Sequence, residues 1–334
     1  MADITNNDHN CTVHGNFTTH YKALSWLMVG EFALGLPLNL SVLYIFIFRF
    51  KFWKNKSILL FNIVVADFLM VACLPVKIYN YQNGERRSED DRMCKTLLFM
   101  LFLNRGASIA FLIALSIDRY FNVVHLGKMN FVKKLKKSPQ ISIIIWLLLL
   151  PLTIPTMLNT FECCNSYGRD EQNVTDTFRE IVFFTQIVIP FIILVYCTVR
   201  MVHRLRKKTV GEKAKLRKAS WVVLSVLAVF SICFLPCAVA RVVLLSFRLK
   251  EWQEAELQAV WVYDSLMVLS FTDCLLDPLV YCLSNSGFRD AYISTFCPMF
   301  LQQRLKKYDL GQSAMNTTTT SAVRNISLPI IDNR

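Results

Sequence analysis

The chain has 334 residues, of which 54% are hydrophobic, and its mean hydropathy is positive. Seven separate apolar runs of roughly 20 residues are more than a water-soluble domain of this length needs, and they predict a helical membrane protein. The formal net charge is +13, but the basic residues gather in alternate loops between the apolar runs, as the positive-inside bias describes. This distribution argues against a phosphate-binding surface, so we expect no nucleic-acid partner.

The predicted fold is an all-α membrane protein, a bundle of seven transmembrane helices followed by a short amphipathic eighth helix. Residues 1–21 form an extracellular tail, 22–284 the bundle, 285–297 the amphipathic helix and 298–334 a disordered cytoplasmic tail. The expected spans are 22–49, 57–81, 92–124, 139–158, 177–203, 215–247 and 257–284. Because the loops after the odd-numbered spans are basic, we expect the N-terminus outside and the C-terminus inside.

Sites of covalent modification are expected at both ends of the chain. Asn10 and Asn16 in the tail, and Asn173 before the fifth span, fit the N-glycosylation pattern, which requires a lumenal location. Cys297 ends the amphipathic helix and is either palmitoylated or a free thiol. The run Thr317 to Ser321 offers candidate phosphorylation sites in the cytoplasmic tail.

The third span carries two arginines, Arg105 in its middle and Arg119 at its end. A charge at membrane depth is expensive, so it usually faces a polar interior and marks a functional site. The two residues are separated by roughly 21 Å along a helix and fall close to one face. We therefore expect Arg105 to face a ligand and Arg119 to face an effector.

Motifs in all seven spans resemble those of the rhodopsin-like, or class A, G-protein-coupled receptors. They lie at Asn39, Asn62–Asp67, Cys94, Asp118–Tyr120, Trp146, Pro190, Phe230–Pro236 and Asp277–Tyr281. Two further runs, Met100–Ser108 and Cys233–Arg241, resemble the hydroxycarboxylic acid receptors and the hydroxyeicosanoid and oxoeicosanoid receptors. The resemblance implies a plasma-membrane receptor that couples to inhibitory Gi/o proteins, inhibits adenylyl cyclase and binds arrestin through its tail.

In that group the arginine that matches Arg105 anchors the ligand carboxylate. Counted from Cys94 at the outer edge, Arg105 lies roughly 16 Å deep. A guanidinium there can hold a carboxylate with two parallel hydrogen bonds. The alternative is that Arg105 forms an internal ion pair with Asp67 or Asp273.

Two roles are open for Lys77 and Arg241: they face the same cavity and make it cationic, or they extend to the lipid headgroups. Candidate walls of the cavity are Tyr79, Tyr81, Leu101 and Phe271. Aromatic residues at helical spacing also serve in ordinary helix packing, which is the alternative for these four.

The resemblance implies two more groups of functional residues inside the bundle. Beneath the ligand pocket, five positions would converge around a sodium ion: Asp67, Asn104, Ser108, Asp273 and Asp277. Oxygen ligands suit such a cation, and the alternative is a water-filled hydrogen-bond network without a fixed ion. The residues of the G-protein switch would be Asp118, Arg119, Tyr120, Phe234, Pro236, Pro278 and Tyr281.

The resemblance also implies two disulfide bonds on the outer side. Cys94 would pair with Cys163 or Cys164, and Cys11 would pair with whichever of these two remains. An oxidising exterior permits both bonds.

Other functions are disfavoured by what the sequence lacks. No metal-spaced His/Cys cluster or nucleophile–base pair is present, so we expect no enzyme, and no internal repeat supports a transporter. A nucleotide or another anionic ligand remains the alternative among receptors, since phosphates also suit a cationic pocket. We expect a monocarboxylate ligand, either a hydroxy or oxo fatty acid such as a hydroxyeicosanoid or a small hydroxycarboxylic acid.

Overall fold

The computed structural model describes residues 16–49, 58–88, 90–124, 140–154, 174–206 and 210–296. Its elements are α1 (Asn16–Tyr44), η1 (Ile45–Arg49), α2 (Ile58–Gln82), α3 (Asp91–Val124), α5 (Gln140–Thr153), α7 (Val174–Arg206), α8 (Val210–Cys233), α9 (Leu235–Leu249), α10 (Gln253–Leu269), η2 (Ser270–Thr272), α11 (Asp273–Ser284) and α12 (Ser286–Phe296). These ranges contain no β-strand, which confirms the all-α prediction. Several predicted sites lie outside them: Asn10, Cys11, Cys163, Cys164, Asn173, Cys297 and Thr317–Ser321.

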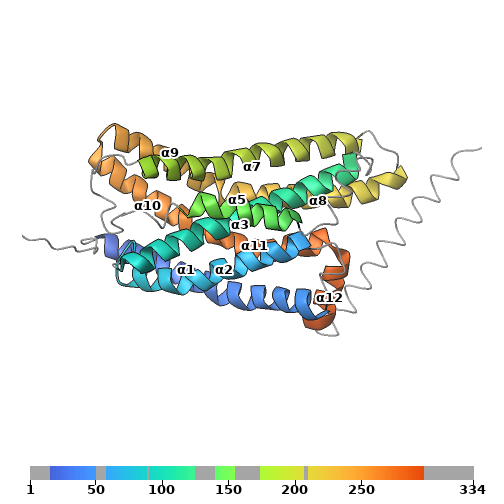
Figure 1. Ribbon diagram of the computed structural model, residues 1–334, viewed down its shortest axis with the longest axis horizontal. Coiled ribbons are helices and arrows are strands. Elements are labelled where there is room, and N and C mark those ends of the chain that lie inside the picture. The colour runs from blue at the N-terminus through green and yellow to red at the C-terminus, as the bar shows by residue number, and fades with distance from the viewer. Residues whose placement is uncertain are drawn as a thin grey trace, which may run out of the picture.

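The helices supply the seven predicted spans. Six stretches are long and apolar enough to cross a membrane: Thr18–Arg49, Ile58–Gln82, Arg92–Phe121, Thr177–Arg206, Ala219–Leu249 and Gln253–Leu283. The shorter apolar helix α5 stands in the place of the predicted fourth span. Figure 1 shows the helices running along the long axis of the molecule, and the outward side chains of α5 are exposed leucines and isoleucines, as a lipid-facing surface requires.

Two of the spans are interrupted, and both interruptions lie beside Arg105. Pro236 has no backbone N–H and disturbs the turn before it, so α8 ends at Cys233 and α9 begins at Leu235. In the seventh span the single 3-10 turn η2 separates α10 from α11. Figure 1 shows α9 and α10 together at one end of the bundle, next to the start of α1, and we refer to this as the outer end.

Helix α1 begins at Asn16, before the predicted start of the span at residue 22. The extension is mostly polar in sequence, but its last residue, Tyr21, packs into the bundle. Tyr21 is fully buried and packs with Leu24 and Met28 against Tyr81 and other residues at the outer end of the bundle. Burial of this apolar surface extends the helix beyond the run that hydropathy alone identifies.

Helix α12 occupies the position of the predicted amphipathic helix, and Figure 1 shows it turned across the opposite end of the bundle. Phe288 on its inner face is fully buried and stacks on Phe46 with ring centroids 4.6 Å apart. The hydroxyl of Tyr292 lies 3.0 Å from that of Ser41 on α1. These contacts attach α12 to α1 and η1 at this end of the bundle.

Candidate functional site

A cavity with an empty volume of about 880 Å³ opens among the outer halves of the helices. Its walls come from α2, the loop after it, α3, α7, α9, α10 and η2. Six of the seven residues predicted to face or line the ligand cavity do line this one: Lys77, Tyr81, Leu101, Arg105, Arg241 and Phe271. The prediction placed them by depth along separate helices, and the fold brings them together.

The cavity is strongly cationic. Six basic residues line it, Lys77, Arg86, Arg87, Arg105, Arg179 and Arg241, against two acidic ones, Glu180 and Asp264. The remaining lining is largely apolar or aromatic: Leu98, Leu101, Phe102, Phe183, Met267 and Phe271 among others. An apolar chamber with a few converging cationic groups suits an amphipathic anion.

Arg105 is buried, and its hydrogen bonds go to neutral acceptors only. Its Nη2 donates to the Ser270 hydroxyl and, at 2.8 Å, to the sulfur of Met267, and the guanidinium lies 5.7 Å from the ring centroid of Phe234. Within the described ranges no carboxylate lies within ion-pair distance of Arg105. The internal pair with Asp67 or Asp273, which the sequence left open, is not formed there.

Lys77 also faces the cavity rather than the headgroups. Its Nζ lies 4.4 Å from the ring centroid of Tyr81, over the aromatic face, and no acidic partner is found for it in the described part of the chain. Tyr79, by contrast, is 64% exposed and does not line the cavity, so its prediction as a wall was wrong. Two residues along a helix correspond to roughly 200° of rotation, which places Tyr79 and Tyr81 on different faces.

Arg241 lines the cavity but is already paired. Its Nε donates to one carboxylate oxygen of Glu180 on α7 at 3.0 Å, and its Nη2 donates to the other oxygen. The guanidinium also lies 5.1 Å from the ring centroid of Tyr263. Glu180 was not among the predicted site residues, although it stands near the start of an apolar span at a depth comparable to that of Arg241.

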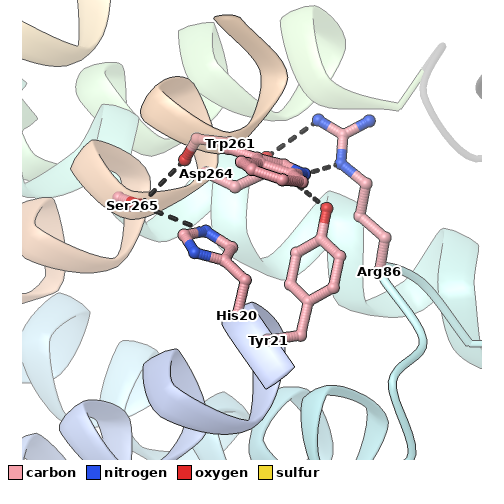
Figure 2. Close-up of polar contacts among 6 residues, drawn as sticks. All are labelled: His20, Tyr21, Arg86, Trp261, Asp264 and Ser265. Atoms are coloured by element: carbon pink, nitrogen blue, oxygen red, sulfur yellow. Dashed lines mark hydrogen bonds and ion pairs between the residues drawn. The ribbon is translucent and has the colours of Figure 1, made fainter. Parts of the chain in front are cut away.

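A second ion pair closes the outer end, and Figure 2 shows its arrangement. Arg86 in the loop after α2 donates from Nε and Nη2 to the two oxygens of Asp264, at 2.6 and 2.8 Å. The hydroxyl of Tyr21 donates to the same carboxylate at 2.9 Å. Beside them, the ring of His20 stacks on Trp261 and its Nε2 lies 3.3 Å from the Ser265 hydroxyl. Sequence reasoning missed this network, which joins α1, the loop and α10.

Arg87, next to this network in the same loop, shows how crowded the positive charges are. Burial, together with the charges of Arg86 and Arg179, lowers the pKa of the Arg87 guanidinium to about 9. The group stays charged at neutral pH, and a bound anion would relieve the repulsion between these cations.

Beneath the cavity lies a layer of buried acidic and polar residues, including all five of the predicted sodium network. Tyr281 donates to Asp67 at 2.5 Å, and Ser108 donates to Asp277 at 3.4 Å. The amide of Asn104 and the other oxygen of Asp277 are buried without a hydrogen-bond partner in the described ranges. Unfilled oxygen atoms of this kind fit a hard cation or ordered water. No group of three or more His, Cys, Asp or Glu residues with the arrangement of a metal site was found among the described residues.

Glu31 on α1 adds a fourth acid to this layer and was missed from the sequence. It is 4% exposed, accepts a hydrogen bond from Thr272 at 3.0 Å, and its second oxygen has no partner among the described residues. In the sequence, Glu31 is distinguished only by being an acidic residue inside the first apolar run.

The residues predicted for the switch lie along the inner half and the helix interruptions. Phe234 and Tyr281 are fully buried, and Pro236 and Pro278 lie at the start of α9 and inside α11. Asp118, Arg119 and Tyr120 follow one another near the inner end of α3, where Tyr120 packs with Cys197, Met201 and Val223. Their role in a G-protein switch stays a prediction.

Cys94 is buried at the outer end of α3 and is a half-cystine. The cysteines expected to pair with it lie outside the described residues, so the choice between Cys163 and Cys164 stays open. Asn16 forms the first residue of α1.

Comparison with known proteins gives a consistent result over most of the chain. The family described as "7 transmembrane receptor (rhodopsin family)" matches residues 38–281. The 12-(S)-hydroxy-5,8,10,14-eicosatetraenoic acid receptor of Mus musculus is 33% identical over 81% of this chain and 87% of its own length. Hydroxycarboxylic acid receptor 2 of Homo sapiens is 32% identical over 85% and 80%, and Oxoeicosanoid receptor 1 of Homo sapiens is 28% identical over 79% and 70%.

Proposed function

Since the chain belongs to the rhodopsin family of seven-transmembrane receptors, in the group of the hydroxycarboxylic acid and eicosanoid receptors, we propose that it is a receptor for a monocarboxylate. It is a multi-pass membrane receptor and not an enzyme, and a G protein is its expected intracellular partner. The family assignment also removes the transporter alternative.

One observation carries the carboxylate proposal. Arg105 is a buried guanidinium that lines the cavity, and its hydrogen bonds go to uncharged groups, among them the Ser270 hydroxyl and the Met267 thioether. Both of these bonds come from Nη2, and arginine has five N–H donors, so donors remain for a ligand. A carboxylate would supply the missing charge in a site that excludes water, where charge-assisted hydrogen bonds are strongest.

The other residues that line the cavity would contact different parts of the ligand. Lys77 adds a second cation without an acidic partner in the described part of the chain, and the aromatic and leucine side chains would hold a hydrocarbon portion. The apolar and aromatic lining, together with the names of the relatives, favours a hydroxy or oxo fatty acid over a small hydroxycarboxylic acid, because these side chains can contact a hydrocarbon chain.

The signalling part of the proposal extends to residues at the inner end. We place the receptor in the plasma membrane with its N-terminus outside, coupled to Gi/o through the region around Asp118, Arg119 and Tyr120. Inhibition of adenylyl cyclase would follow, with arrestin binding the phosphorylated run from Thr317 to Ser321. The concentration of basic residues in the inner loops supports this orientation and a contact with anionic membrane lipids.

A sodium ion is the proposed occupant of the polar layer. Asp67, Ser108, Asn104, Asp273 and Asp277 would hold it, since their buried oxygen atoms include two, Asn104 Oδ1 and Asp277 Oδ1, without a hydrogen-bond partner among the described residues. The ion would neutralise part of the acidic charge there and so favour the packing of the helices around it.

The test is inhibition of cyclic AMP in cells that express the receptor. The panel holds lactate, 3-hydroxybutyrate, nicotinate, hydroxy and oxo fatty acids, and nucleotides. Arg105→Ala should reduce the potency of the active acid at least about thirtyfold, the loss expected when one partner of a desolvated charge pair is removed. Pertussis toxin should abolish the response if the coupling is through Gi/o.

Arg92→Ala is the matched control, because Arg92 is an exposed arginine of the same helix and does not line the cavity. Its potency should equal that of the wild type at equal surface expression. A response to an acid that survives Arg105→Ala would overturn the anchor. A response to nucleotides alone would replace the monocarboxylate by the alternative anionic ligand.

A further inference from the structure

Four of the six cations that line the cavity fall into two groups. Arg241 and Arg86 are each held by a carboxylate through Nε and Nη2, from Glu180 and Asp264 respectively. Arg105 and Lys77 have no acidic partner within the described residues. The two carboxylates that line the cavity therefore occupy Arg86 and Arg241 and leave Arg105 open to an anionic ligand.

The Arg241–Glu180 pair occupies the face of the guanidinium that a ligand would use. Both side chains are largely buried, with 14% and 20% of their surface exposed, and they come from different helices, α9 and α7. Nε and Nη2 together form the fork that matches the two oxygens of a carboxylate. With Glu180 on that fork, a second ligand carboxylate would meet a cation already satisfied and a like charge beside it.

Resting on the proposed function, we infer that Glu180 is a specificity-determining residue that restricts the receptor to ligands with a single carboxylate. Glu180 acts through Arg241, by filling the guanidinium fork that would otherwise hold the second acidic group of a dicarboxylate with two parallel hydrogen bonds; Lys77, a single ammonium group, offers no such fork. Arg105 is then the principal anchor, and Arg241 contributes shape and aromatic contact through Tyr263 rather than an open charge.

The second pair does not serve the same purpose. Asp264 accepts a third hydrogen bond, from Tyr21, and thereby joins α1 and the loop after α2 to α10. Its removal would release a structural connection together with Arg86. Glu180 has Arg241 as its one recorded partner among the described residues, so its charge can be removed with less disturbance of the bundle.

Removing the charge of Glu180 should allow the receptor to bind dicarboxylates that the wild type excludes. In Glu180→Gln the fork of Arg241 becomes an open anion site in the same cavity as Arg105. A dicarboxylate long enough to reach both guanidiniums would then gain one charge-assisted bidentate pair, whereas a monocarboxylate would gain nothing. The ratio of half-maximal concentrations, dicarboxylate to monocarboxylate, should fall about tenfold or more.

The experiment uses the full-length receptor in the cyclic AMP assay. The probes are the straight-chain monocarboxylates from butanoate to eicosanoate, their α,ω-dicarboxylates, and the most active acid of the earlier panel with its ω-carboxy derivative. Glu180→Ala is measured beside Glu180→Gln, so that whichever of the two variants reaches the cell surface tests the inference. The double variant Glu180→Gln/Arg241→Gln should lose the gain for dicarboxylates, since the freed guanidinium is absent.

Glu256→Gln is the matched control. Glu256 forms an ion pair with Arg248 at 2.9 Å, between α10 and α9, and neither residue lines the cavity. Its dicarboxylate ratio should equal that of the wild type. An unchanged ratio in the Glu180 variants, with a monocarboxylate response that still requires Arg105, would overturn the inference and leave the proposed function standing. If the wild type answers no acid at all, the proposed function fails first and the inference fails with it.

Discussion

The outer cavity and the polar layer beneath it carry opposite charges and satisfy them differently. In the cavity, six basic residues face two acidic ones, and the acids are held by bidentate ion pairs between elements distant in sequence. In the layer below, the acids Glu31, Asp67, Asp273 and Asp277 are buried, and their side-chain donors are the neutral hydroxyls of Thr272, Tyr281 and Ser108.

Because of this difference, we expect the outer cavity to be rigid and the polar layer to adapt when helices move. A bidentate ion pair fixes both orientation and distance, so the outer pairs hold the cavity open in one shape. A carboxylate that accepts a hydrogen bond from one hydroxyl can still bind water or a cation through its remaining lone pairs, and it can exchange partners when helices move. Arg105 lies between the two regions, because it lines the cavity while its guanidinium contacts Ser270 at the break above α11.

The largest effect on stability is expected for Asp264→Ala. The substitution leaves Arg86 and Tyr21 without their shared acceptor in a largely buried site, and breaking a buried pair from one side costs about 3–5 kcal/mol. Unfolding of the purified receptor in detergent, followed by tryptophan fluorescence, measures the loss. A double variant Arg86→Met/Asp264→Leu, which removes both charges, should recover much of it. Equal losses in the single and double variants would contradict the role of the unpaired charge.

Tyr281→Phe tests the layer below and should have a smaller effect. The hydroxyl of Tyr281 donates to Asp67 at 2.5 Å, and both groups are buried. Its removal leaves that carboxylate oxygen without its donor, at a cost of about 1–3 kcal/mol. If a cation or water takes over the oxygen, high sodium concentration should reduce the loss. The same unfolding measurement at low and high sodium, with potassium as the ionic-strength control, separates these cases.

The contrast between the two regions also marks what the sequence could predict. Depth along each span, together with the resemblance, was sufficient to place Lys77, Leu101, Arg105 and Phe271 in one cavity, because a helix fixes depth and face. The sequence did not allow us to predict which acidic and basic residues pair with each other. Asp264 meets Arg86 across 178 positions and Tyr21 across 243, and Arg241 meets Glu180 across 61.

The physical reason is that many acids and bases lie at similar depth, and local pattern does not select among them. Arg241 was predicted to be either an open cation or a headgroup contact, and it is a paired cation inside the cavity. Glu31 is a similar case. A lone acidic residue within an apolar run indicates that it has a polar partner, but the sequence does not identify the helix that carries this partner. Only the packing of α1 against η2 identifies Thr272.

Glu31→Gln should leave stability unchanged or raise it by up to about 2 kcal/mol. Glutamine keeps the oxygen that accepts the Thr272 hydrogen bond and removes a buried charge that has no basic partner in the described layer. Unfolding in detergent measures the change, and Thr272→Val, which removes the donor and keeps the acid, serves as the opposite variant and should destabilise. Clear destabilisation by Glu31→Gln would show that the ionised acid is itself required, as a cation ligand would be.

The smallest net effect is expected for Gly106→Ala, at the boundary between the two regions and next to Arg105. Alanine gains roughly 1 kcal/mol over glycine inside a helix, but the added Cβ would lie 3.0 Å from a methyl group of Leu149 and 3.1 Å from the Gln186 amide nitrogen. Both neighbours are the ends of flexible side chains, so part of the crowding can be relieved, and the two contributions should nearly cancel. Gly30→Ala on α1 is the matched control, because nothing lies within 4 Å of its added Cβ and it should show the full helical gain. Equal stabilisation by the two substitutions would mean that α3 is not tightly packed beside Arg105, and the anchor would then be less rigidly held than the outer ion pairs.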